Sequence, residues 1–164
     1  MLRGRCQRFL GKHAARKVPE VSGEARCAEG ARGAGHQTIT QKWWSARKSF
    51  DLYISQFVLD EASQGDAEAA DRRLAALDDI SMLDATADAT SLAVALVAGG
   101  GLPPKARVDA FHVAIATVHG MDYLLSWNCK HIANAMLRGR IEAICRAAGY
   151  EPPVICTPLE LVEE

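Results

Sequence analysis

The chain lacks the long apolar segments of membrane and secreted proteins. None of its 164 residues lies in an apolar run approaching the roughly 18 to 20 residues of a membrane span, and the basic N-terminus has no apolar stretch that would make it a signal peptide. Hydrophobic residues make up 49% of the chain, which is enough for one domain with a real core, while the length is too short for two. We therefore expect one cytoplasmic domain.

Closely spaced cysteine pairs are absent too. The five cysteines include no CxxC pair and are scattered along the chain as Cys6, Cys27, Cys129, Cys145 and Cys156. An odd, scattered set argues against both a disulfide framework and a structural zinc site. Buried or unreactive thiols are the better interpretation.

A phosphate-binding glycine loop is also missing. Residues 99–104 read Gly-Gly-Gly-Leu-Pro-Pro, but they do not follow a strand and open a helix in the phosphate-binding spacing. We interpret them as a linker.

The net charge of −1 hides a difference between the two parts of the chain. Residues 1–36 hold eight basic and three acidic residues, which gives +5, and the remainder holds 11 basic and 17 acidic residues, which gives −6. The first segment is rich in Gly, Ala and Arg and shows no apolar period. We expect residues 1–35 to be an atypical, disordered basic segment; an RNA-contacting arm is the alternative, and it rests on charge alone.

From residue 38 onward, apolar spacing predicts alternating helices and strands. The expected helices cover residues 38–48, 56–64, 67–77, 88–98, 107–119 and 131–148, and the expected strands cover 51–55, 80–83, 123–125 and 154–156. This order favours an α/β domain over residues 36–164, with a largely parallel central sheet flanked by helices. Right-handed crossovers would gather the carboxyl ends of the strands at one edge.

Three oxygen-bearing side chains are expected at that edge. Glu61 lies one and a half helix turns beyond the strand at 51–55, Asp109 starts the long helix, and Asn128 follows the strand at 123–125. Carboxylate and amide oxygens suit Mg²⁺ or Mn²⁺. A metal bound there could generate a hydroxide and stabilise the oxyanions of a phosphodiester.

Each of these residues also has a structural interpretation. Glu61 could be a helix-surface acid, Asp109 could favour the helix dipole, and Asn128 could cap the next helix. Asp109 lies beside an apolar stripe, so we do not expect it to be fully solvated; the stripe consists of Val108, Phe111, Ile115 and Val118. Ser126 could orient a ligand or end a strand.

Other side chains with chemical potential are more readily structural. His112 and His131 could act as acid or base groups, but this type of metal chemistry needs neither, so core or cap roles are favoured. Trp43 and Trp44 could stack on RNA bases, although their helical spacing beside Ile39 favours core or dimer contacts.

Several segments resemble a PIN domain, in particular the branch of VapC-type toxins. They are residues 59–63 (LDEAS), 109–116 (DAFHVAIA), 123–134 (YLLSWNCKHIAN) and 151–158 (EPPVICTP). The resemblance covers roughly residues 36–162 and is most specific around Asn128. It implies a PIN-like fold and an endoribonuclease that depends on Mg²⁺ or Mn²⁺ and cleaves single-stranded or structured RNA, with Glu61, Asp109 and Asn128 as metal ligands and catalytic residues and Ser126 in support. It also implies a cognate antitoxin and a homodimer.

The chain departs from that family in two ways. PIN domains open with an apolar strand that ends in an acidic metal ligand, whereas here only residues 18–22 (VPEVS) echo this pattern, and their proline argues against a central strand. We therefore expect the first strand to be missing or non-native and its acid to be lost. The second departure is Asn128, which stands where most PIN domains have Asp and brings no charge.

The change in composition near residue 35 suggests that residues 1–35 are translated out of frame or from a misassigned start. Two functions then remain open. The first is a metal-dependent endoribonuclease; the alternative is a catalytically impaired PIN scaffold that binds an antitoxin or RNA. Loss of one carboxylate typically costs several kcal/mol of metal affinity and transition-state stabilisation, so the missing acid discriminates between them.

Overall fold

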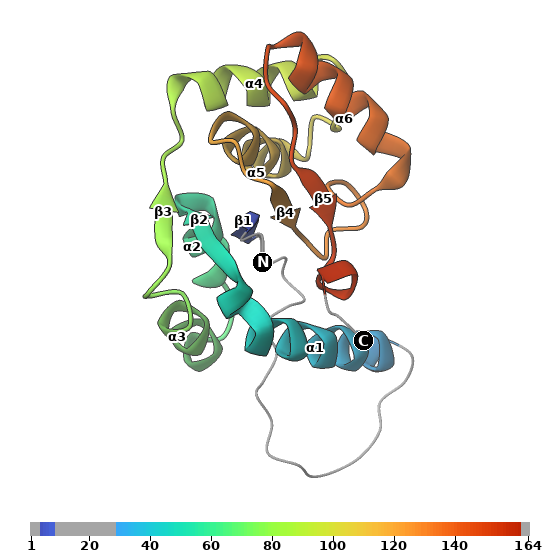
Figure 1. The fold of residues 1–164 in the computed structure, drawn as a ribbon. Coiled ribbons are helices and arrows are strands. Elements are labelled where there is room, and N and C mark those ends of the chain that lie inside the picture. The colour runs from blue at the N-terminus through green and yellow to red at the C-terminus, as the bar shows by residue number, and fades with distance from the viewer. Residues whose placement is uncertain (1–3, 9–28, 162–164) are drawn as a thin grey trace.

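Five parallel strands form one sheet through the middle of the molecule (Figure 1). The computed structural model describes residues 4–8 and 29–161. The strands are β1 (Gly4–Arg8), β2 (Phe50–Ser55), β3 (Ser81–Leu83), β4 (Tyr123–Leu125) and β5 (Val154–Cys156), and they lie in the order β3-β2-β1-β4-β5. Every neighbouring pair is parallel. The predicted α/β domain with a largely parallel sheet is therefore confirmed.

The first strand was expected to be missing or non-native, and the structure corrects the first of these alternatives, because a central strand is present. β1 pairs with β2 on one side and with β4 on the other, so that Gln7 lies opposite both Tyr53 and Leu124. Its sequence, Gly-Arg-Cys-Gln-Arg, has neither β-branched nor aromatic residues, which is why propensity did not indicate a strand. Backbone pairing on both edges places it in the sheet. Neither β1 nor the four residues after it, Phe-Leu-Gly-Lys, contain an acid.

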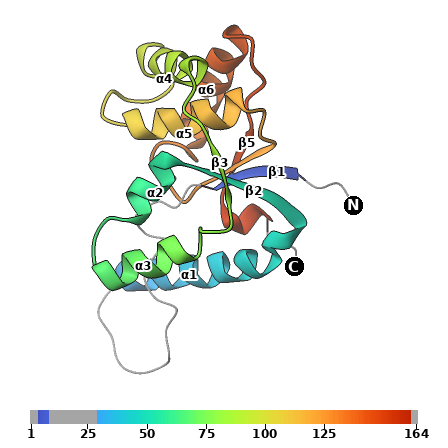
Figure 2. The ribbon, with the colours of Figure 1, turned by 90° about the vertical axis from the view of Figure 1, so that its left-hand side faces the viewer.

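Helices cover both faces of the sheet (Figures 1 and 2). The described helices are α1 (Glu29–Ala46), α2 (Gln56–Ala62), α3 (Ala67–Ala75), α4 (Ala87–Ala98), α5 (Arg107–Val118) and α6 (Ala135–Ala147), with short 3₁₀ segments η1 (Arg47–Ser49) and η2 (Pro158–Leu161). Figure 2 shows α1 and α3 on one side of the sheet and α4, α5 and α6 on the other. No helix of the described residues is long and apolar enough to cross a membrane.

The first helix crosses the expected boundary between residues 35 and 36. α1 begins at Glu29, although apolar spacing predicted a start at 38, and it continues to Ala46. The division into residues 1–35 and residues 36–164 therefore cuts through a helix. Within the expected basic segment, the structure describes a strand at Gly4–Arg8 and a helix from Glu29 onward, and residues 9–28 lie outside the described part of the chain.

Turn chemistry sets the other helix ends. Asp66 caps α3 by accepting a hydrogen bond from the backbone N–H of Ala69 (3.0 Å). α6 starts at Ala135 and not at 131, because Asn134 accepts from the N–H of Met136 (2.9 Å) and the residues before it form turns.

The triple glycine is more than the linker we expected. The N–H groups of Gly101 and Leu102 both donate to the carbonyl of Leu96 and so close the end of α4. A Cβ added to Gly99 would lie 2.9 Å from the Cδ1 of Ile144 on α6. These glycines therefore allow the end of α4 to pack against α6.

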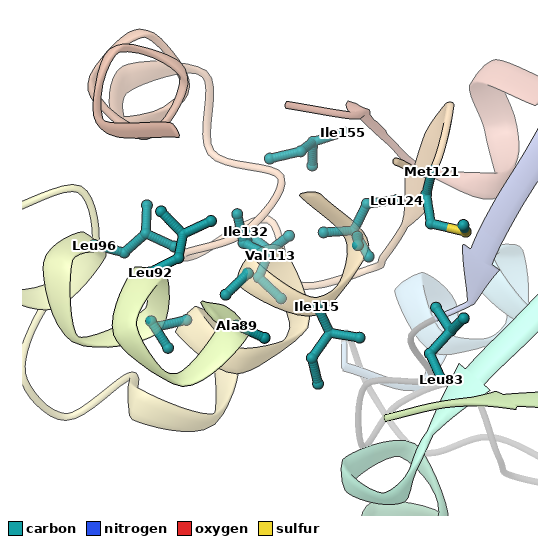
Figure 3. Packing of buried hydrophobic residues seen from close by; sticks show 14 of the residues in the cluster. Leu83, Ala89, Leu92, Leu96, Val113, Ile115, Met121, Leu124, Ile132 and Ile155 are labelled. Atoms are coloured by element: carbon teal, nitrogen blue, oxygen red, sulfur yellow. The ribbon is translucent and has the colours of Figure 1, made fainter. Parts of the chain in front are cut away.

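The main core lies between the sheet and the α4, α5 and α6 layer (Figure 3). Figure 3 shows Leu92 of α4, Val113 of α5 and Leu124 of β4 within one packed group. α5 is buried almost all round, so the predicted single stripe is only partly correct: Ile115 is fully buried, but Val108 is 42% exposed.

A second cluster lies on the α1 side of the sheet. Trp43 is fully buried there and packs with Leu125 and Cys156, while Trp44 lies at the margin of the cluster. The core role expected for Trp43 is therefore confirmed.

Candidate functional site

The candidate residues gather where the strand order reverses. The chain runs outward through β1, β2 and β3 in one direction and through β4 and β5 in the other, so β1 and β4 are neighbours. In open parallel sheets, ligands bind at the carboxyl ends of the strands beside such a reversal. Asn128 follows β4 at this edge, and Asp109 lies in the first turn of α5, the helix that runs back to feed β4.

Asp109 is the centre of the site. Its Oδ1 accepts a hydrogen bond from Nδ2 of Asn128 (2.9 Å), and its Oδ2 lies 2.7 Å from Nδ1 of His131. The residue is 9% exposed, which confirms that it is not fully solvated. Because each carboxylate oxygen has a partner, the side chain is held in one orientation.

Asn128 links Asp109 to the turn that follows β4. Its Oδ1 accepts from the backbone N–H of His131 (3.1 Å), and its own N–H donates to Oγ of Ser126 (2.9 Å). Ser126 is fully buried, and its N–H donates to the carbonyl of Cys156 at the end of β5. Asn128 therefore caps a turn while its amide nitrogen faces Asp109. Its oxygen keeps one free lone pair beside this cap, but the oxygen does not face Asp109.

Glu61, on α2, lies beside α5, one turn after Asp109. Its Oε2 is 3.9 Å from Nε2 of His112, which follows Asp109 by three residues on α5 and is fully buried. This Oε2 is buried and has no hydrogen-bond partner among the described residues. Phe57 stacks on Phe111 (4.7 Å between ring centroids) and so holds α2 against α5. Glu61 is therefore not the free surface acid of the structural interpretation.

The structure thus brings Asp109 and Asn128 into direct contact and places Glu61 beside His112. Within residues 4–8 and 29–161, no three His, Cys, Asp or Glu side chains converge as a group that could hold a metal ion. The buried Oε2 of Glu61 is the atom that a cation would satisfy, because a buried carboxylate oxygen without a donor is costly. Asp109 keeps spare lone pairs on both oxygens. Asp109, and Glu61 through His112, are therefore the two carboxylates that lie along the first turns of α5.

Sequence reasoning missed the role of His131 in this site. We expected a core or cap role, and its backbone N–H does donate to Asn128, but its ring also binds Asp109. The spacing Asn128-x-x-His131 was the available signal, because a capped turn returns its third residue toward the capping side chain.

A contact with α1 supports the same turn. The Trp127 ring stacks on His36 with 4.0 Å between ring centroids and 11° between planes, and Nε1 of Trp127 donates to Oγ1 of Thr40 (2.8 Å). Trp127 directly precedes Asn128, so this contact holds the turn of the site against α1. Nothing in the local sequence of His36 indicates this pairing.

A separate apolar pocket of about 230 Å³ lies between α2, α3 and the β3 edge of the sheet. Its lining consists of Ile54, Leu59, Leu74, Leu77, Asp78, Ile80 and Met82. It shares no residue with the site around Asp109 and contains one titratable side chain. We assign no chemistry to it.

Comparison with protein-family models, with curated proteins and with solved structures finds no match to this chain. The geometry around Asp109 and the sequence resemblance of the segments quoted above are therefore the two supports for a functional inference.

Proposed function

We propose that the protein is a divalent-metal-dependent endoribonuclease with a PIN-like fold, of the type found in VapC toxins. The observation that carries this proposal is the pair of carboxylates at the strand reversal: Asp109, held by Asn128 and His131, and Glu61, whose buried Oε2 has no hydrogen-bond partner within the described residues. Its partners are an RNA substrate, a cognate antitoxin and a second copy of the chain.

Each residue has a distinct role in this proposal. Glu61 and Asp109 would hold Mg²⁺ or Mn²⁺, and Asn128 would be the neutral ligand once its amide oxygen turns toward Asp109. Ser126 supports the site by holding the backbone of Asn128. His131 occupies Oδ2 of Asp109 and so fixes the direction of the other lone pairs. The bound ion supplies activation of the attacking water and neutralises the charge of the phosphodiester.

The alternative is a catalytically impaired scaffold that binds an antitoxin or RNA. The lack of an acid at the end of β1 favours it, because β1 lies between β2 and β4 at the edge where the other candidates gather. With two carboxylates in place of three, the site offers less negative charge to a divalent ion, and its metal affinity falls accordingly.

The reading frame offers a test that needs no protein. If residues 1–35 are translated out of frame, another frame of the upstream nucleotides should encode a strand that ends in Asp or Glu at the place of β1. Translation in all three frames decides this. The out-of-frame hypothesis fails if none of them contains such a strand.

The enzymatic test compares two proteins on labelled single-stranded RNA with Mn²⁺. One is the chain as printed, and the other carries a first strand that ends in Asp. We expect Mn²⁺-dependent cleavage by the restored protein and at least about 100-fold slower cleavage by the printed chain, since loss of a charge-stabilising group costs several kcal/mol. Asp109→Asn in the restored protein should abolish cleavage, whereas Asp78→Asn, in the separate apolar pocket, should not.

Two outcomes would decide against parts of the proposal. Equal Mn²⁺-dependent cleavage by both proteins would show that the first-strand acid is dispensable and would overturn our account of the site, but not the nuclease activity. RNA or antitoxin binding by the restored protein without any Mn²⁺-dependent cleavage would favour the scaffold.

A further inference from the structure

Nearly every arginine whose side chain the structure describes contacts another group of the protein. Arg73, Arg138 and Arg140 donate to backbone carbonyls, and Arg146 pairs with two acids. Arg47 lies over the Trp44 ring, and Arg72 pairs with Glu68. Arg107 is the exception: it is exposed, and it has no hydrogen bond or ion pair with any described residue.

Two lysines near Arg107 in the fold also lack a hydrogen-bond or ion-pair partner among the described residues. Lys105 and Lys130 are exposed and have no partner in the described residues. Lys105 and Arg107 precede Asp109 by four and two residues, and Lys130 lies between Asn128 and His131. Because Asp109 contacts both Asn128 (2.9 Å) and His131 (2.7 Å), the three cations come from the two chain segments that meet at that carboxylate. They therefore lie within four residues of Asp109 or Asn128 along these two segments.

The position of these cations does not favour the helix that carries one of them. Arg107 is the first residue of α5 and Lys105 precedes it, although positive charge opposes the dipole at a helix N-terminus. The N-cap residue, Ala106, offers no side-chain cap. Neither cation stabilises the fold through a described contact.

The carboxylates of the site make nearby cations favourable for a polyanion. Residues 37–164 carry a net charge of −6 and residues 1–36 carry +5, and the site itself holds the carboxylates of Asp109 and Glu61. An RNA strand approaching this edge is repelled unless local positive charge offsets them.

We propose that Lys105, Arg107 and Lys130 form a cationic rim that binds the backbone phosphates of single-stranded RNA on either side of Asp109. This inference rests on the proposed ribonuclease function and names how its substrate is held. Arg107 can bind a phosphate through two parallel N–H groups, and the lysines act as point charges. Such contacts depend on charge and not on sequence, so the rim sets affinity and register without selecting bases.

The test measures binding separately from cleavage. A fluorescein-labelled 12-nucleotide single-stranded RNA is titrated with the full chain in EDTA, and anisotropy gives Kd between 50 and 200 mM salt. We expect the Lys105→Gln/Arg107→Gln/Lys130→Gln variant to bind at least about 10-fold more weakly at 50 mM salt. Its slope of log Kd against log salt should fall by about 2, because each single-strand phosphate contact contributes about 0.7.

Lys42→Gln/Lys48→Gln is the matched control. Both lysines are exposed and uncommitted, but they lie on the last turns of α1 and in η1, which lead into the amino end of β2 at the opposite edge of the sheet. This variant should bind within twofold of the unaltered chain. Circular dichroism checks that both variants keep the fold.

Three results would overturn the rim: no measurable binding by the unaltered chain at 50 mM salt, binding by the triple variant within twofold of it, or equal weakening by the control. The cleavage assay distinguishes this failure from that of the nuclease. If the triple variant weakens Kd but the restored protein shows no Mn²⁺-dependent cleavage, the rim is supported and the nuclease function is wrong. If the restored protein cleaves RNA but the triple variant leaves Kd unchanged, the nuclease function is supported and the rim is wrong.

Discussion

The Asp109 carboxylate is held by two hydrogen-bond partners and still keeps lone pairs that could bind a ligand. It accepts from Asn128 and pairs with His131, yet it stays 9% exposed at the carboxyl edge of the sheet. Charge-assisted hydrogen bonds of this kind hold a side chain in place without using all of its lone pairs. The hydrogen bond from Asn128 also explains why a neutral amide suits this position when no cation is bound.

Replacing Asn128 by Asp should turn the attractive contact with Asp109 into a repulsive one. The new carboxylate would face Asp109 at the distance where Nδ2 now donates (2.9 Å), so the hydrogen bond becomes a repulsion. We expect Asn128→Asp to lower the free energy of unfolding by about 1–3 kcal/mol in EDTA and to increase the rise in Tm on adding Mn²⁺. Differential scanning fluorimetry with and without Mn²⁺ measures both effects.

Asn134→Asp is the control for this substitution. Asn134 is the N-cap of α6, and Asp caps as well as Asn does. Asp loses only the exposed hydrogen bond from Nδ2 to the carbonyl of Lys130 (2.9 Å), so the stability should fall by no more than about 1 kcal/mol and Mn²⁺ should have no added effect. An unchanged Tm in EDTA for Asn128→Asp would contradict the contact with Asp109.

The described cysteines should differ sharply in reactivity. Burial raises the pKa of Cys156 to about 12 and also raises the pKa of Cys145, whereas Cys129 is exposed. In a Cys6→Ser/Cys27→Ser background at pH 8, we expect one thiol to react rapidly with Ellman's reagent and two more to react only after unfolding. Cys129→Ser should remove the rapid reaction; two rapid thiols would show that a buried one is accessible.

The same shifts predict how stability depends on alkaline pH. A thiol whose pKa is higher in the folded state than its ordinary value of 9.0 contributes stability that is complete below pH 9. This contribution is lost as pH rises from about 9 to about 12, because the unfolded chain releases the proton first. The urea midpoint should therefore be lower at pH 10 than at pH 8.

At the scale of elements, local sequence signals predicted most of the helices and strands. The strand expected at 51–55 lies at Phe50–Ser55, and those at 123–125 and 154–156 have the predicted bounds. Short apolar runs between turn residues are strong local signals. Helix starts were less predictable, as for α1 and α6, because they depend on caps and on tertiary packing.

The end of α4 gives a test of how an element terminates. Gly100 has φ of +69°, a conformation that costs an L-residue about 1–2 kcal/mol. Gly100→Ala should lower the free energy of unfolding by that amount. Gly139→Ala is the matched control: Gly139 lies inside α6 with nothing within 4 Å of an added Cβ, so alanine should raise stability by up to about 1 kcal/mol.

Urea unfolding of both glycine variants measures these effects. Equal effects of the two substitutions would show that the end of α4 does not require a left-handed residue.

At the scale of the whole molecule, the sheet depends on a central strand, β1, that its own sequence does not predict. β1 pairs with both β2 and β4, so it joins the part of the sheet that ends in β3 to the part that ends in β5. A central strand of this kind is specified by its neighbours, because the hydrogen bonds on both of its sides are backbone bonds.

Substitutions at Gln7 distinguish a central strand from a basic tail. Gln7→Pro removes a backbone N–H and should cost about 3 kcal/mol or more, whereas Gln7→Val keeps the N–H and should leave cooperative unfolding intact. Thermal unfolding followed by near-ultraviolet circular dichroism measures both. If residues 1–35 form a tail without structure, the two variants will unfold like the original chain.

The sequence alone determined the alternation of helices and strands and the placement of Asp109 and Asn128 at the carboxyl edge of the sheet. Apolar periodicity and turn residues act within a few positions, so they can be read locally. Only the tertiary structure decided that Gly4–Arg8 is the central strand, that His131 holds Asp109 and that Glu61 faces His112. These depend on contacts between segments far apart in the chain, and the only local signal among them was the spacing from Asn128 to His131.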